Sequence, residues 1–111
     1  MLRLTSSSDY ARLRQSQYKV VGKYFLIVYI EDTRLTENIT GITVSKKIGN
    51  AVERNRVKRR VKAFLQKFSC PIITKAFLCN IIACKSVVDA DWLSICRDLE
   101  SCFKKIQISI N

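Results

Sequence analysis

The chain has 111 residues, of which 48% are hydrophobic, and its 20 Lys and Arg against 9 Asp and Glu give a formal net charge of +11. This length suffices for one small domain with a modest core, and the apolar content argues against disorder. So large an excess of positive charge indicates a polyanionic partner, with nucleic acid first and an anionic membrane surface second.

Nothing in the sequence indicates a membrane span or a metal site. No apolar run is long enough for a transmembrane helix or a signal peptide, so we expect a cytoplasmic protein. The chain has no His, and its five Cys form no CxxC pair. We therefore expect no structural zinc site, and reduced cysteines that act as small core residues. These are Cys70, Cys79, Cys84, Cys96 and Cys102.

The N-terminal part is predicted to hold one short helix. Residues 1–7 are polar, and we expect them to be mobile. Ser8 is predicted to cap a helix over residues 9–15, with Arg14 one turn after Tyr10. Tyr10 is compatible with two interpretations, an aromatic in or beside the core and a stacking surface for an unpaired nucleotide.

Two strands should follow this helix. Residues 20–30 are β-branched and aromatic, which predicts one strand with both faces partly covered. Residues 39–45 alternate apolar and Thr side chains and predict a second strand. The polar residues 31–38 between them predict a turn, so the two strands should form a hairpin.

The most distinctive stretch is residues 46–68. Eight cations fall within residues 46–62, opposed only by Glu53, and such a single-sign block repels itself unless an anion binds it. A helix over residues 51–68, with Asn50 as its N-cap, would still have a buried stripe. The stripe contains Val57, Val61, Phe64 and Phe68. The outward side contains Asn55, Lys58, Arg59 and Lys62.

The remaining chain completes an α+β fold. Cys70 and Pro71 should end the basic helix, and residues 77–84 predict a third long strand in which a buried Asn80 would need a partner for its amide. Asp89 or Asp91 should cap a final amphipathic helix. The order is helix, strands, basic helix, strand, helix. It predicts a two-layer α/β sandwich that occupies residues 1–111 as a single domain.

The residues argue for binding rather than catalysis. Without His, with scattered acids and with no glycine-rich phosphate loop, the chain shows no protein active site. A basic helix could enter a DNA groove, but no helix-turn-helix, zinc or heptad pattern accompanies it. Folded RNA is favoured, because a rigid array of Arg and Lys can bridge its crowded phosphates.

The basic stretch resembles a known signature. The run GNAVERNRVKRR at residues 49–60, preceded by VSKK at residues 44–47, is similar to the RNR motif of the bacterial ribonuclease P protein component. Arg3-Leu4, Asp9-Tyr10 and Arg12 resemble the amino-terminal pattern of that family, and residues 77–85 resemble its last strand. The resemblance covers about residues 3–106.

This resemblance implies a fold, an activity and a partner. The fold would have a left-handed βαβ crossover, which helix physics alone would not predict. A large RNA subunit with bound Mg²⁺ would hydrolyse one phosphodiester of precursor tRNA and remove its 5′ leader. The protein would assist as the subunit that binds both RNAs, with no catalytic residue, metal ligand or small-molecule cofactor of its own.

The resemblance also implies which residues contact RNA. Those expected to bind the RNA subunit are Lys46, Lys47, Asn50, Arg54, Asn55, Arg56, Lys58, Arg59, Arg60 and Lys62. The single-stranded leader would lie in a cleft between the sheet and the first helix, with Tyr10, Arg14 and Ser45. Arg14 departs from the family, which commonly has an aromatic there, and another cleft aromatic corresponds to Val28 or Tyr29.

Three other functions fit parts of the same pattern. A structural RNA-binding protein of the ribosomal type would share every compositional feature and differ only in its partner. A metal-dependent nuclease would cleave RNA without an RNA subunit. A polybasic helix at a membrane surface would need its apolar stripe free for lipid.

Overall fold

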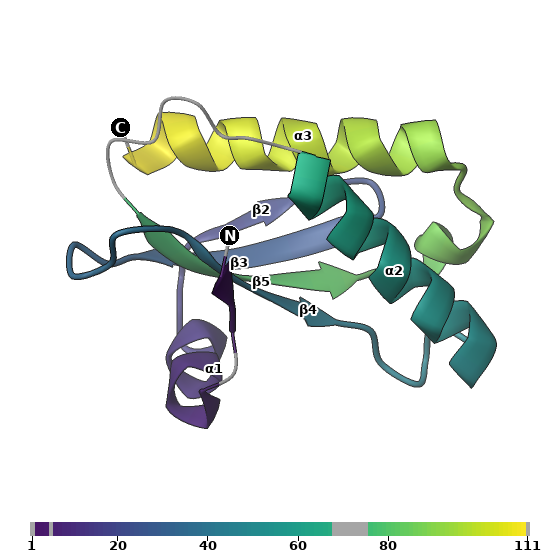
Figure 1. Cartoon of the computed structure of the whole chain (residues 1–111), viewed down its shortest axis with the longest axis horizontal. Helices are drawn as coiled ribbons and strands as arrows, with labels where there is room; N and C mark the ends of the chain where they lie inside the picture. The colour runs from purple at the N-terminus through teal and green to yellow at the C-terminus, as the bar shows by residue number, and fades with distance from the viewer. Residues whose placement is uncertain (1, 5, 68–75, 111) are drawn as a thin grey trace.

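A five-stranded mixed sheet in the order β1-β4-β5-β3-β2 organises the chain in the computed structural model, which describes residues 2–4, 6–67 and 76–110 (Figure 1). β5 lies at its centre, antiparallel to β3 and parallel to β4. The strands are β1 (Leu2–Arg3), β2 (Lys19–Val21), β3 (Phe25–Glu31), β4 (Ile39–Thr43) and β5 (Phe77–Ala83).

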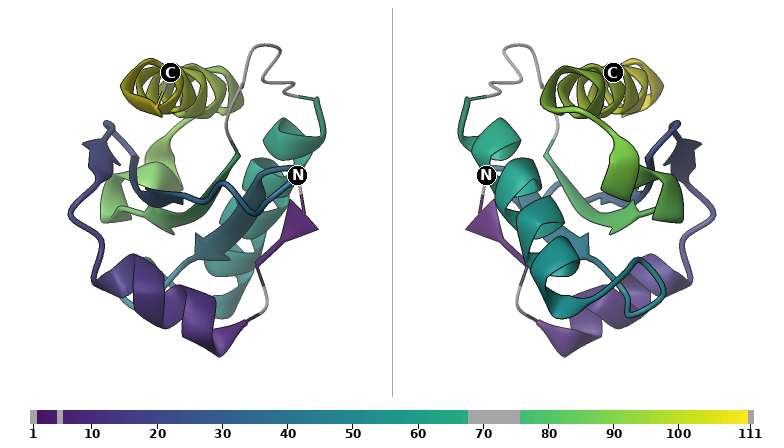
Figure 2. Two further views of the ribbon diagram at one scale, coloured as in Figure 1. Left: turned by 90° about the vertical axis from the view of Figure 1, so that its left-hand side faces the viewer. Right: turned by 90° about the vertical axis from the view of Figure 1, so that its right-hand side faces the viewer.

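Helices cover both faces of this sheet. Figure 2 shows α1 (Ser7–Arg14) and α3 (Trp92–Ile110) on opposite sides of the strands. The basic helix α2 (Ala51–Lys67) packs on the same core as α3, and the short 3₁₀ helix η1 (Lys85–Asp89) joins β5 to α3. The α+β fold and the predicted order of the main elements are therefore confirmed.

The main core lies between the sheet and the pair α2 and α3. Phe25, Ile27 and Ile81 from the central strands are fully buried, and the rings of Phe64 and Phe103 stack with centroids 6.3 Å apart. Burial of a large apolar side chain contributes about 1.5–3 kcal/mol, so this layer supplies most of the driving force for folding. It also fixes which side of α2 faces solvent.

A smaller cluster holds α1 against the other face of the sheet. Leu13 of α1 is buried together with Leu4 and Leu78. Leu4 is only 3% exposed, and its backbone N–H donates to the Thr40 carbonyl at 2.9 Å. For the described residues 2–4, the prediction of mobility is therefore wrong, because β1 pairs in parallel with β4, a partner too far along the chain to be recognised locally.

The first helix begins earlier than the sequence predicts. Ser6, not Ser8, is its N-cap, and the Ser6 hydroxyl accepts from the Asp9 backbone N–H at 3.4 Å. The run of three serines offers several capping residues of equal chemistry. Ser6 accordingly starts a helix that ends at Arg14.

The strand predicted over residues 20–30 is two strands. β2 and β3 form an antiparallel hairpin whose turn contains Gly22, Lys23 and Tyr24. The carboxylate of Asp98 on α3 accepts from the backbone N–H groups of Lys23 and Tyr24 at 2.8 and 2.9 Å. A distant carboxylate thus stabilises a turn within a sequence that reads as uniformly strand-forming.

The hairpin predicted from residues 20–30 and 39–45 is also wrong. β5 lies between β3 and β4 and bonds to both, so those two strands do not pair with each other. β4 ends at Thr43, two residues before the predicted end. β4, α2 and β5 form a βαβ unit with parallel neighbouring strands, as the resemblance implies. The left-handedness of its crossover stays a prediction.

Several local predictions are confirmed. Asp91 caps α3, with its carboxylate 2.7 Å from the Ser94 N–H, and the hydrogen bond to that N–H lowers the pKa of Asp91. Cys79 and Cys102 are buried thiols in the core, and burial raises the pKa of Cys102 to about 11. The predicted helix end at residues 68, 70 and 71 lies outside the described residues.

Candidate RNA-binding surface

The start of α2 is fixed by a reciprocal pair of hydrogen bonds. The Asn50 side-chain oxygen accepts from the Glu53 backbone N–H at 2.9 Å, and the Asn50 backbone N–H donates to the Glu53 carboxylate at 3.1 Å. This capping box satisfies two backbone donors and confirms Asn50 as the N-cap. Glu53, the one acid in the cationic block, therefore serves to start the helix.

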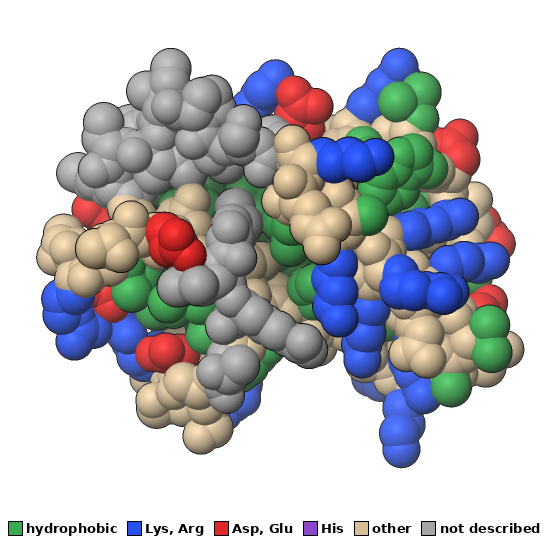
Figure 3. Space-filling view, viewed as in Figure 1, with side chains coloured by type: hydrophobic (Ala, Val, Ile, Leu, Met, Phe, Trp, Pro, Cys, Tyr) green, Lys and Arg blue, Asp and Glu red, His purple; other side chains and the backbone are tan. Residues whose placement is uncertain are grey.

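The apolar stripe of α2 determines which cations face outward. Val57, Val61 and Phe64 are buried in the main core, as predicted. Because residues on the opposite side of a helix must then point to solvent, a cationic surface follows directly. Figure 3 shows Lys and Arg side chains gathered over α2.

A shallow groove of about 430 Å³ runs along this outward side of α2. We call it the outer α2 groove. Its lining confirms the predicted outward set and adds an exposed apolar residue near the N-terminal end of the helix. It is formed by Val52, Asn55, Lys58, Arg59 and Lys62.

Three other arginines of the motif donate to backbone carbonyls. Arg54 donates to Gly49 at 2.9 Å. Arg56 donates to Val88 at 3.3 Å and Arg60 to Ala90 at 3.1 Å, which ties α2 to the segment before α3. A guanidinium has five N–H donors, so these contacts leave donors for a ligand. This structural role was not predicted from the sequence, although the spacing of four residues between Arg56 and Arg60 places them on one side of the helix.

The turn before α2 presents two further cations. Lys46 and Lys47 are exposed, and the turn is held by Ile48, whose N–H donates to the Ser45 carbonyl at 3.1 Å and whose side chain is buried. These lysines thus sit on an ordered turn that leads into the basic helix. Ser45 lies in the same turn, past the carboxyl end of β4, and is exposed.

The predicted leader-binding residues of α1 border a second surface. Tyr10 lies above β4, because a Cβ added to Gly41 would be 2.7 Å from the Tyr10 hydroxyl. Arg14 is exposed at the C-terminal end of α1. Beside α1, neither α2 nor α3 covers the sheet, and the side chains there are only half-buried. We call this area the open sheet face. It consists of Leu26, Val28, Thr43, Asn80 and Ile82.

The structure distinguishes the two strand residues that the sequence left open. Val28 packs with the cluster under α1, on the side of the open sheet face. Tyr29 points to the other side, where it is buried and its hydroxyl donates to Ser109 of α3 at 2.8 Å. Val28 is therefore the residue at this face, and Tyr29 belongs to the core.

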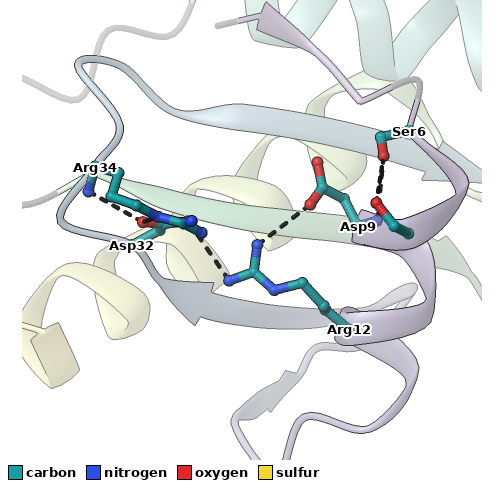
Figure 4. Close-up of polar contacts among 6 residues, drawn as sticks. Ser6, Asp9, Arg12, Asp32 and Arg34 are labelled. Atoms are coloured by element: carbon teal, nitrogen blue, oxygen red, sulfur yellow. Dashed lines mark hydrogen bonds and ion pairs between the residues drawn. The ribbon is translucent and has the colours of Figure 1, made fainter.

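A four-residue ion network attaches α1 to the loop after β3 (Figure 4). Arg12 contacts both Asp9, at 3.2 Å, and the buried Asp32, at 3.5 Å. Asp32 also accepts from the backbone and side chain of Arg34. These hydrogen bonds from Arg34, aided by Arg12, hold the pKa of Asp32 well below its usual range. The network was not predicted, because it joins α1 to the loop after β3, two segments about 20 residues apart in the chain.

Two possible kinds of site have no support in the described part of the chain. No three His, Cys, Asp or Glu side chains lie close enough there to hold a metal ion. Likewise, no helix among those residues is long and apolar enough to cross a membrane.

Comparison with known proteins identifies relatives over nearly the whole chain. The family model named Ribonuclease P matches residues 1–107. The ribonuclease P protein component of Desulforapulum autotrophicum is 36% identical over 104 residues, covering 94% of this chain and 87% of its own. That of Streptococcus thermophilus is 35% identical over 97 residues, covering 87% and 85%.

Solved structures agree with this assignment. The RNase P protein of Staphylococcus aureus superposes with a TM-score of 0.84 at 27% identity, over 96% of this chain and 95% of its own. That of Thermotoga maritima shares the fold, with a TM-score of 0.81 at 22% identity over 95% and 97%. The motif on α2, the fold and the relatives agree, and the chain belongs to the ribonuclease P protein component family.

Proposed function

We propose that this chain is the cytoplasmic protein subunit of a ribonuclease P, in which an RNA subunit carries out the catalysis. Its task would be to bind that RNA together with precursor tRNA and so assist removal of the 5′ leader. The observation that carries the proposal is the outer α2 groove. Its cations sit on a capped helix whose opposite stripe is locked in the core.

The geometry suits the phosphates of folded RNA. Lys58, Arg59 and Lys62 lie one turn or less apart, so one rigid helix presents several cations without ordering flexible segments on binding. Arg adds bidentate contacts to phosphate. Each phosphate neutralised releases counterions, so affinity should fall steeply with salt.

The open sheet face would bind the single-stranded leader. Half-buried apolar side chains next to Tyr10 offer a surface on which unpaired bases can stack. Arg14, at the end of α1, could place its guanidinium plane on a base or pair with a phosphate. Ser45 and the following lysines would extend this path toward α2.

Mg²⁺ would supply the chemistry on the RNA rather than on the protein. The described residues contain no fitting set of metal ligands, so no catalytic step is assigned to a protein-bound ion. The protein would reduce the repulsion between two polyanions, the RNA subunit and its substrate. That contribution is largest where Mg²⁺ is scarce.

Removal of two groove cations tests the proposal. In Arg59→Ala combined with Lys62→Ala, we expect the slope of log affinity for the RNA subunit against log salt to become shallower by about one unit for each phosphate that the variant no longer neutralises. Cleavage of precursor tRNA by the reconstituted holoenzyme at low Mg²⁺ should slow in parallel. Binding is measured by filter retention over a salt series.

A variant with the same charge change provides the control. Lys104→Ala combined with Lys105→Ala removes two exposed cations from α3. It should change neither the salt slope nor cleavage. If both double variants weaken binding equally, the groove contributes only nonspecific positive charge. If neither variant changes binding, α2 is not part of the RNA interface.

A further inference from the structure

A polar residue stands in the middle of the open sheet face. Asn80 is on the central strand β5, with Val28 of β3 on one side and Gly41 of β4 on the other. The next row of the sheet contains Leu26, Ile82 and Thr43. An amide in such an apolar setting costs desolvation free energy unless its polar atoms have partners.

In the described part of the chain, only the oxygen of this amide has a hydrogen-bond partner. The Thr43 hydroxyl donates to the Asn80 side-chain oxygen at 3.0 Å. Among the described residues, no acceptor receives a hydrogen bond from the Asn80 amide nitrogen, and this nitrogen is not fully buried. Thr43 therefore orients the amide and leaves its N–H donors accessible from the open sheet face.

Tyr10 is close to the same point. Its hydroxyl lies above Gly41, the residue paired with Asn80 in the β4–β5 register. Gly41 gives Tyr10 this room, since a side chain there would collide with the ring. An aromatic ring, an apolar strand residue and an oriented pair of N–H donors thus meet at one location.

We propose that Asn80 is a specificity-determining residue that donates a hydrogen bond to an acceptor on the edge of one unpaired leader nucleobase. The inference rests on the proposed function, because it requires the leader to bind the open sheet face. Tyr10 and Val28 would hold the base by stacking and apolar contact, without preference for its identity. The amide would discriminate, since a base that presents a donor there leaves both groups unpaired.

The test uses the holoenzyme and precursor tRNAs whose leaders vary one position at a time. For the wild-type protein we expect one leader position with a base preference of about fivefold to tenfold in kcat/KM, the size of one hydrogen bond. Asn80→Val should reduce that preference to about twofold or less. Affinity for the RNA subunit alone should not change.

Two variants of the orienting residue separate base recognition from simple packing. Thr43→Val keeps the shape but removes the hydroxyl, so it should weaken the preference. Thr43→Ser keeps the hydroxyl and should preserve it. Both leave Asn80 in place, so they report on the inference even if Asn80→Val perturbs the strand.

The outcomes distinguish this inference from the proposed function. If precursor tRNA with a leader and mature tRNA bind the wild-type holoenzyme equally well, the protein does not bind the leader. The inference about Asn80 is then wrong as well. If the leader matters but shows no base preference, or if Asn80→Val retains the preference, the inference is overturned while leader binding stands. Loss of the preference in Asn80→Val and Thr43→Val, but not in Thr43→Ser, supports it.

Discussion

At the scale of single residues, acidic side chains explain how several elements of this basic protein are held in place. Several of the nine acids have clear structural tasks at or between elements. Glu53 completes the cap of α2, Asp98 anchors the turn between β2 and β3, and Asp32 holds α1 through Arg12. Each is an internal counter-charge whose removal should weaken the fold.

Asp32 should make the stability of the protein depend on pH. Its pKa in the folded state lies below its unfolded value, which is about 3.9. The stabilisation is therefore complete above about pH 5 and lost as the pH falls toward the folded pKa. Asp32→Asn should lower the free energy of unfolding by about 1–2 kcal/mol at pH 7 and flatten its decline in acid.

Urea unfolding at several pH values measures both effects. Glu37→Gln, which removes one negative charge from an exposed position in the loop after β3, should leave the pH dependence as it is in the wild type. An unchanged decline in Asp32→Asn would show that other carboxylates carry the acid sensitivity.

At the scale of elements, α2 combines a high density of positive charge with firm packing. It is dense in like charge, yet it begins at a defined residue and packs firmly through Val57, Val61 and Phe64. The cap and the stripe offset the self-repulsion of the cations. Binding then needs little ordering of the helix, which favours affinity.

The capping box of α2 should be measurable on its own. Asn50→Ala should lower the free energy of unfolding by about 1 kcal/mol, because the first turn loses its side-chain acceptor. Glu53→Gln should cost less, since Gln can make the same reciprocal bond. A loss in Glu53→Gln as large as that in Asn50→Ala would show that the charge of Glu53 contributes to the first turn as well as its hydrogen bond.

At the scale of the whole molecule, the net charge of +11 should make stability depend on anions. Sulfate should raise the melting temperature more than chloride at equal ionic strength, because an anion bound to the folded state stabilises it by mass action. The gain should shrink in the variant that lacks Arg59 and Lys62. A gain of equal size there would place the anion site elsewhere.

The sequence predicted the elements with strong local patterns. The stripe and cap of α2, the strand at residues 77–83 and the Asp91 cap of α3 depend on residues within a few positions of one another. The turn at residues 22–24 and strand β1 were missed because distant partners determine them, namely Asp98 and β4. Within the candidate site, helical periodicity predicted which cations of α2 face outward. The carbonyl contacts of Arg56 and Arg60 required tertiary structure.

The order of the strands has a consequence for synthesis. β5 is the last strand along the chain, yet it is the central strand of the sheet, and β3 and β4 meet only through it. Until residues 77–83 have left the ribosome, those two strands lack their shared neighbour and keep open edges that could pair with other chains. The cationic helix emerges before β5, so a nascent chain already displays α2 when the sheet on which it will rest is still incomplete.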